Sequence, residues 1–293
     1  MKRFLFTSSS LLLSTLAVAQ YVEPVLARAK YSFIHVRDTN NRNAPYTEAM
    51  ILMLGKSSSW YTSETRLNQT VGFMSHVNEQ IKNNGGTLNG ATISAQKRTN
   101  TSMADFYCFR ASNTLNIGEK MINFFYTEET IPPIHWEITK DTASFSGLKC
   151  QKAIALFKGR TWIAWFASSI PFQSGPWKLN GLPGLIVEAY DSKKDVQFLF
   201  NGFETTESTP KVQTNKISGE MIDTSEMTDF IKLPNNAIKT TKEELQRLKM
   251  AHAEDPIGFA KTQLAGTPFA KLLENKPNLP RKVVFMNNPI ELP

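Results

Sequence analysis

The stretch LKCQKAIALFKGRTWIAWFAS, residues 148–168, holds two apolar runs on either side of a short turn. Each run, 148–157 and 161–168, has the length of a β-strand, and Lys158-Gly159-Arg160 between them suits a tight connection. This pattern predicts a β-hairpin. Similar runs, most of them bounded by Gly, Pro, Asn or Asp, predict further strands at 30–38, 48–54, 59–63, 91–97, 104–111, 119–127, 134–139, 184–190 and 195–203.

The predicted strands set the fold class. Eight of them lie between residues 91 and 204. Strands that follow one another so closely form antiparallel sheets, and a sheet of this size tends to curl. We therefore predict a mainly β protein of the α+β class, with a curved antiparallel sheet that forms a half-barrel or a barrel-like structure.

Two stretches have a helical period instead. Apolar residues recur three and four positions apart from Leu67 to Ile81, and the sequence NNGG at 83–86 follows as a stop signal. This predicts an amphipathic helix at 66–84, which could cover the mouth of the curved sheet. A second, short helix is expected after the capping-box-like sequence at Thr241, and Pro256 would end it.

The first nineteen residues resemble an export signal. Lys2 and Arg3 precede a mainly apolar stretch, and residues 17–19 form an A-x-A cleavage site. We therefore expect a signal peptide at 1–19, a β-rich domain at 20–235, and a helical and irregular C-terminal appendage at 236–293. The expected location is the periplasm, or outside the cell and associated with the outer membrane.

The composition excludes several classes of protein. The chain is 41% hydrophobic and 11% aromatic, which is enough to build a core and disfavours disorder. Its formal charge is +7, or about +5 without the signal peptide, which is too mildly basic to indicate a nucleic-acid partner. After the signal, no apolar run reaches the roughly 18 residues of a membrane-spanning helix, so no transmembrane segment is expected.

Cys108 and Cys150 are the two cysteines of the chain. In an oxidising compartment they could form a disulfide, which would close a loop of about 42 residues and stabilise the fold by roughly 3 to 4 kcal/mol. Two buried, unpaired thiols are the alternative, because sequence gives no distance between them. We predict that the two residues lie on neighbouring elements and are oxidised.

The most unusual segment of the chain is GPWKLNGLPGLI, residues 175–186. Its glycines and prolines specify a particular backbone path into a buried strand, so an architectural role is expected. The motif residues are Gly175, Pro176, Trp177, Gly181, Leu182, Pro183, Gly184, Leu185 and Ile186.

Residues 181–186 spell GLPGLI, and the chain resembles the GLPGLI family of secreted proteins from Gram-negative bacteria. The resemblance implies export and an envelope setting, often beside outer-membrane uptake systems, and it brings no catalytic residues because the family has no established activity. It also covers Trp136, residues 148–153, residues 157–160, Trp165, Ile170-Pro171, the strand around Tyr31 and residues 288–292.

Motifs of enzyme sites are missing from the sequence. There is no G-x-S-x-G or H-E-x-x-H, and no glycine-rich loop leads into a helix to hold phosphate. We therefore predict no catalytic residue, no metal and no cofactor. The remaining candidate pairs, Glu128 with Glu129 and Glu188 with Asp191, are interpreted as surface charges. The histidines, His35, His76, His135 and His252, are widely separated.

The tryptophans point to binding. Trp162 and Trp165 are three positions apart, so they face opposite sides of one strand, and Trp177 lies in the constrained loop. Packing in the core would explain all three. Alternatively, one face of this sheet and Trp177 line a concave apolar surface formed by strands 148–157 and 161–168, and Trp177, Trp165 and Trp162 are the candidate ligand-binding residues.

We therefore predict an exported, non-enzymatic envelope protein whose curved sheet binds an apolar or amphipathic ligand, or a partner protein of the envelope. Two alternatives stay open. One is a hydrolase or metal-dependent enzyme whose site is assembled from dispersed residues. The other is an accessory protein of an outer-membrane uptake complex.

Overall fold

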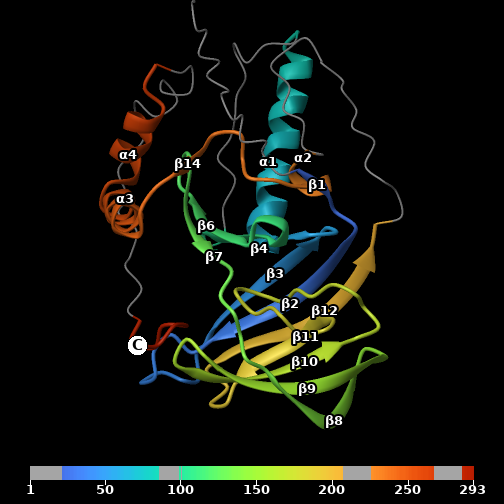
Figure 1. The fold of residues 1–293 in the computed structure, drawn as a ribbon. Helices are drawn as coiled ribbons and strands as arrows, with labels where there is room; N and C mark the ends of the chain where they lie inside the picture. The colour runs from blue at the N-terminus through green and yellow to red at the C-terminus, as the bar shows by residue number, and fades with distance from the viewer. Residues whose placement is uncertain (1–21, 86–98, 100, 207–225, 267–285) are drawn as a thin grey trace, which may run out of the picture.

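The computed structural model of the protein describes residues 22–85, 99, 101–206, 226–266 and 286–293. Its main feature is a sheet of twelve strands (Figure 1). The predicted signal peptide and the predicted strand at 91–97 lie outside the described residues. In sheet order, the strands are β14 (Ala237–Lys239), β7 (Phe124–Thr130), β6 (Thr114–Lys120), β5 (Ala104–Phe109), β4 (Ser58–Ser63), β3 (Tyr46–Leu54), β2 (Ala27–His35), β12 (Val196–Thr205), β11 (Leu185–Asp191), β10 (Arg160–Ala167), β9 (Leu148–Phe157) and β8 (Glu137–Phe145).

The sheet consists of two antiparallel meanders. Strands β2 to β7 form one and strands β8 to β12 form the other, and the pairing of β2 with β12 joins them. The sheet is strongly curved (Figure 1). It stays open, because the edge strands β14 and β8 do not pair with each other. The predicted fold class, a curved antiparallel half-barrel of a mainly β protein, is confirmed, and a closed barrel is not formed.

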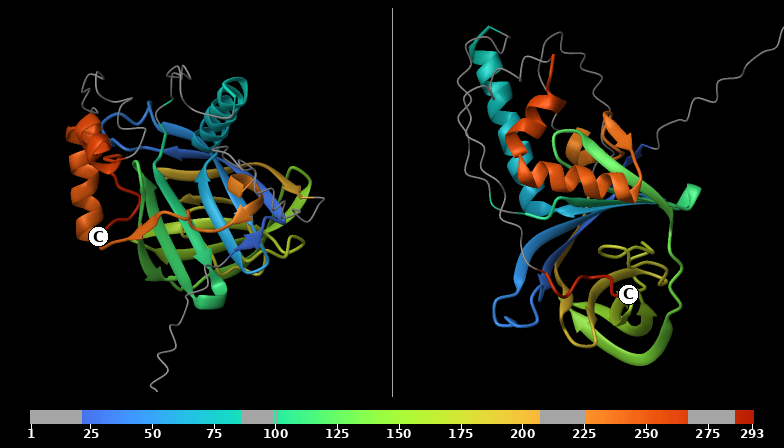
Figure 2. Two further views of the ribbon diagram at one scale, coloured as in Figure 1. Left: turned by 90° about the horizontal axis from the view of Figure 1, so that it is seen from above. Right: turned by 90° about the vertical axis from the view of Figure 1, so that its left-hand side faces the viewer.

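The concave face carries the larger hydrophobic core. Buried residues alternate along β2, where Ala27, Ala29, Tyr31 and Phe33 face this core. The loop between β10 and β11 enters it and contributes Ile170, Trp177, Leu179 and Leu182. The concave side is therefore filled by a loop of the same chain, which Figure 2 shows inside the curved sheet.

The helix predicted at 66–84 is present as α1 (Glu64–Asn83), which begins at Ser63, whose hydroxyl accepts a hydrogen bond from the Arg66 backbone. Its position differs from the expectation. Leu67 packs against a second cluster, which includes Ile51, Met53 and Trp60 and lies on the opposite face of the sheet from the larger core. The start of the helix therefore lies on the outer face, whereas the loop between β10 and β11 fills the concave side.

The first C-terminal helix lies beside β7, on the opposite face of this strand from the cluster that contacts α1, because Phe124 faces that cluster and Phe125 faces the C-terminal helix. Helix α3 (Lys242–Glu254) packs Leu245 against Met121 and Phe125. Pro256 ends this helix as predicted, and it also begins α4 (Pro256–Gln263). Among the described residues, no helix is long and apolar enough to cross a membrane. The shorter elements are β1 (Glu23–Pro24), 3-10 helix η1 (Arg110–Ser112), α2 (Glu226–Asp229) and β13 (Phe230–Ile231).

One predicted strand is wrong. The stretch 119–127 contains the end of β6, a turn at 121–123 and the start of β7, because β6 ends at Lys120 and β7 begins at Phe124. The sequence did not indicate this turn, because Met121 is apolar and turn residues are usually polar. The structure explains this, because Met121 is buried against α3.

The described residues of the predicted appendage, 236–266 and 286–293, contribute to the same fold. Strand β14 pairs with β7 in parallel, and α3 and α4 follow it. The last residues, 286–293, return to the end of the sheet near the turn between β9 and β10, where the Leu292 amide donates to the Lys158 carbonyl. We call residues 286–293 the C-terminal strap.

Candidate functional site

The GLPGLI loop approaches the backbone of β10 closely at Gly184, where a side chain would not fit. Gly184 has a φ of +152°, and a Cβ there would overlap the carbonyl oxygen of Ala167. Gly181 also has a positive φ, +90°, but open space surrounds its Cα. The loop ends in buried Ile186, whose carbonyl accepts a hydrogen bond of 2.8 Å from the Tyr31 hydroxyl across the core. These contacts support the architectural role expected from the sequence.

The three tryptophans predicted to bind a ligand lie in or beside the core. Trp177 packs on Trp162, with ring centroids 5.5 Å apart, and on Phe157, so it does contact β9 and β10. Trp165 faces the other side of β10, as predicted, and packs on Phe145. The cavity beside Trp177 has a volume of about 20 Å³, roughly the space of one water. The ligand role of these three residues stays a prediction, and packing accounts for them.

The two cysteines are on distant strands. Cys108 lies on β5 and Cys150 on β9, with six strands between them in the sheet, and both thiols are free. The prediction that they lie on neighbouring elements and pair is therefore wrong for this structure. Strands that are close in sequence were assumed to be close in the sheet, but β5 and β9 belong to different meanders.

Burial makes the Cys150 thiol a weak acid. Loss of solvation, with a smaller contribution from the charge of Glu188, raises the pKa of Cys150 from 9.0 to about 11. Because the thiolate is the nucleophile, we expect the native protein to alkylate at Cys150 with iodoacetamide at least about a hundredfold more slowly than the urea-unfolded protein near pH 8. Peptide mapping by mass spectrometry would measure both rates. A disulfide-linked peptide in unreduced protein would contradict the structure.

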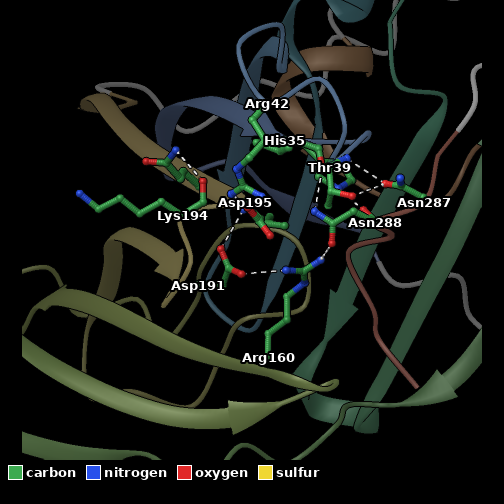
Figure 3. Close-up of polar contacts among 12 residues, drawn as sticks. His35, Thr39, Arg42, Arg160, Asp191, Lys194, Asp195, Asn287 and Asn288 are labelled. Carbon is green, nitrogen blue, oxygen red and sulfur yellow. Dashed lines mark hydrogen bonds and ion pairs between the residues drawn. The ribbon is translucent and has the colours of Figure 1, made fainter.

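A buried polar cluster joins the C-terminal strap to the sheet (Figure 3). Its centre is Arg160, whose guanidinium donates to Asp191 Oδ2 at 2.7 Å and, within the strap, to Asn288 Oδ1 at 2.6 Å and to the carbonyls of Pro289 and Ile290 at 2.6 and 2.8 Å. The side chains of Arg160 and Asp191 are 2% and 3% exposed. Interpreting Asp191 as a surface charge was therefore wrong.

Other groups of this cluster are also satisfied. His35 Nε2 lies 2.7 Å from the carbonyl oxygen of Asn288, and burial lowers the pKa of this imidazole. The Asn288 amide donates to the Val36 carbonyl, and Asp191 Oδ1 accepts from the Val196 amide. Donors and acceptors that are already paired are poorly placed to take a ligand. We conclude that the cluster fastens the strap.

The remaining candidates for chemistry do not converge. Glu129 accepts from Lys178 and pairs with Lys242, and Glu128 pairs with Lys239. The four histidines lie on different elements, and within the described ranges no three His, Cys, Asp or Glu side chains are grouped as metal ligands.

A cavity of about 490 Å³ opens on the outer face of the sheet, between the start of α1 and the segment around β13. We call it the outer-face cavity. Trp60 and Tyr107 stack with centroids 5.3 Å apart, and Phe124 meets Tyr107 edge to face at 5.9 Å, so three aromatic rings form its floor. Its lining is Trp60, Thr62, Arg66, Leu67, Thr70, Asp105, Tyr107, Lys120, Phe124, Phe230, Lys232, Pro234, Asn235 and Asn236.

An ion pair forms one wall of the outer-face cavity. Arg66 Nη2 donates to Asp105 Oδ1 at 2.6 Å and to Thr62 Oγ1 at 2.9 Å, and its Nε donates to the Ser102 carbonyl at 3.0 Å. Asp105 is buried on the strand that also carries Tyr107. This places a fixed charged pair directly beside the aromatic floor.

Lys120 adds a second cation to the cavity wall. Its side chain is solvent-accessible, yet the surrounding protein lowers its pKa by removing solvation, Asp105 opposes this, and Arg66 adds a smaller lowering effect. Lys120 thus faces an open cavity while the surrounding protein removes part of its solvation. The ammonium is partly desolvated and near a guanidinium.

This cavity was not predicted from the sequence. One signal was present, since Asp105, Tyr107 and Phe109 alternate on one face of a predicted strand, and an acidic residue on an aromatic face needs a partner. The partner, Arg66, is 39 residues away at the start of a helix. Trp60 also borders the cavity, and its buried Nε1 has no hydrogen-bond partner among the described residues.

Comparison with known proteins places part of the chain in a family model. Residues 95–188 match the model described as protein of unknown function (Porph_ging), the family also called GLPGLI. No curated protein matches.

Two solved structures are similar at a distance. PNGF-II in space group P21 aligns with a TM-score of 0.48 and 11% identity, over 76% of this chain and 32% of that chain. PNGF-II in space group C2 aligns with a TM-score of 0.46 and 10% identity, over 75% of this chain and 32% of that chain. The aligned part of this chain thus corresponds to about a third of the length of the PNGF-II chains.

Proposed function

We propose that this protein is an exported, non-enzymatic binding protein of the cell envelope, and that it holds an amphipathic small molecule in the outer-face cavity. The observation that carries the proposal is the pairing of an aromatic floor with a charged wall in a cavity of about 490 Å³. Ligand sites of this size are mainly apolar and hold a few polar groups that fix orientation. The signal-like N-terminus is the support for export.

The polar groups of the cavity are suited to binding more than to catalysis. The carboxylate of Asp105 is held by two hydrogen bonds from Arg66, at 2.6 and 3.3 Å. Both oxygens of this carboxylate are thus already hydrogen-bonded to the guanidinium. The Arg66–Asp105 pair instead keeps the cavity wall rigid, because the guanidinium also bonds to Thr62 and to the Ser102 carbonyl.

The proposal is tested with N-phenyl-1-naphthylamine, a neutral dye that becomes fluorescent in apolar sites. Thr70 lines the outer-face cavity from α1, whereas Asn68 on the same helix is exposed and does not line it. We expect the wild type and Asn68→Trp to bind the dye alike, and Thr70→Trp to bind it about tenfold more weakly because the indole fills part of the cavity. Fluorescence titration measures the three affinities.

Two results would count against the proposal. One is a wild type that gives no fluorescence change at any dye concentration below the solubility limit of the dye. The other is equal binding by Thr70→Trp and Asn68→Trp, which would place the dye elsewhere on the protein. Circular dichroism of both variants shows whether the helix and the sheet are retained.

A further inference from the structure

We propose that the ligand of the outer-face cavity is an amphipathic anion, whose charged group lies at Lys120 and whose apolar part lies on Trp60, Tyr107 and Phe124. This inference rests on the proposed function and adds the chemical class of the ligand. A carboxylate and a phosphate ester share the required chemistry, because each combines negative charge with acceptor oxygens on an apolar body.

The charges of the cavity lining are unbalanced. Two cations, Arg66 and Lys120, stand against Asp105, which is the one acidic side chain among the described residues of the lining. Asp105 is already held by Arg66. The cavity therefore has a net positive charge that an anionic ligand would neutralise, and a cationic ligand would be repelled.

Lys120 is the cation that can contact a ligand. The Arg66 donors are largely used by Asp105, Thr62 and the Ser102 carbonyl, so Arg66 contributes its charge more than free N–H groups. Within the described part of the chain, no carboxylate lies within ion-pair distance of Lys120. The lowered pKa of Lys120 supports the same conclusion. Burial and the nearby guanidinium disfavour its charged form, and a bound anion would offset both effects.

Local backbone geometry places the apolar part of the ligand next to Lys120. Lys120 is opposite Phe124 in the pairing of β6 with β7, so both side chains emerge on the same face of the sheet. Gly118 lies two residues earlier, and the ring of Phe124 occupies the space that a side chain there would need. The ring thus lies over β6 and extends the aromatic floor toward the lysine.

The test uses three amphiphiles of equal chain length to displace bound N-phenyl-1-naphthylamine: decanoate, 1-decanol and decyltrimethylammonium. We expect decanoate to displace the dye from the wild type at about tenfold lower concentration than 1-decanol, and the cation to be the weakest. Lys120→Gln should remove the preference for decanoate. Lys193→Gln is the matched control, because Lys193 is exposed in the turn between β11 and β12, does not line the cavity, and makes the same charge change.

The outcomes separate this inference from the proposed function. If the dye binds but decanoate and 1-decanol displace it equally, or if Lys120→Gln and Lys193→Gln retain the same preference, the cavity still binds apolar molecules and the anionic class is wrong. If the dye does not bind the wild type, both are wrong. Loss of the preference in Lys120→Gln alone supports the assignment. Decyl phosphate in a fourth arm then shows whether phosphate esters are favoured over carboxylates.

Discussion

Replacing Arg160 with methionine is expected to lower the free energy of unfolding by about 3 to 5 kcal/mol. Methionine keeps much of the apolar length of the side chain but leaves the carboxylate of Asp191, 3% exposed, buried without its cation. It also removes the donors to Asn288 Oδ1 and to the carbonyls of Pro289 and Ile290. The C-terminal strap should therefore detach before the rest of the fold melts.

Urea unfolding followed by circular dichroism measures this effect. Arg247→Met is the matched control, because Arg247 pairs with Glu244 on the exposed face of α3 and its side chain is 77% exposed. Exposed pairs of this kind contribute less than about 1 kcal/mol, so the control should unfold close to the wild type. Equal, small effects of the two substitutions would mean that the strap does not depend on Arg160.

A second variant keeps the test informative if Arg160→Met fails to fold. Arg160→Lys retains the charge near Asp191 but cannot reproduce the four hydrogen bonds of the guanidinium. We expect an intermediate loss of stability. Faster amide exchange in residues 286–293, with unchanged exchange in β2, would show that the strap is the part released.

The sequence revealed most of the elements but not the contacts between distant ones. Strands such as β9 and β10 were predicted because alternating apolar residues and a glycine turn are local signals. Arg160 was interpreted as part of that turn. It is instead the first residue of β10, and its partners in the strap are about 130 residues away, so no local pattern could reveal its burial.

The same limit applies to the site. The tryptophans attracted attention because the residue type is rare and often binds ligands, yet Trp162 and Trp177 fill the concave side. The outer-face cavity depends on which face of β5 and β6 lies toward α1. This is set by the pairing of β4 with β5, two strands that α1 separates in the sequence. Residue propensities predict β4, β5 and α1, but they do not predict the order of the strands in the sheet.

The GLPGLI loop allows a test in which two glycines of the same motif are compared. We expect Gly184→Ala to lower the free energy of unfolding by roughly 3 kcal/mol and Gly181→Ala by about 1 kcal/mol. Both residues have a positive φ, +152° and +90°, so alanine is strained at each. Only at Gly184 would the new Cβ also overlap a backbone carbonyl, that of Ala167, whereas at Gly181 the space is open.

The difference between the two variants isolates the close approach of the loop to β10, because the chemical change and the motif are the same. Thermal and urea unfolding give the two stabilities, and equal losses would show that backbone dihedral strain alone explains the glycines. Dye binding supplies an independent readout: the loop packs on the concave face and the outer-face cavity lies on the other, so folded Gly184→Ala should bind N-phenyl-1-naphthylamine as the wild type does. A variant with unchanged stability and lost binding would instead assign the motif to the ligand site, and would overturn the architectural role on which the interpretation of this loop depends.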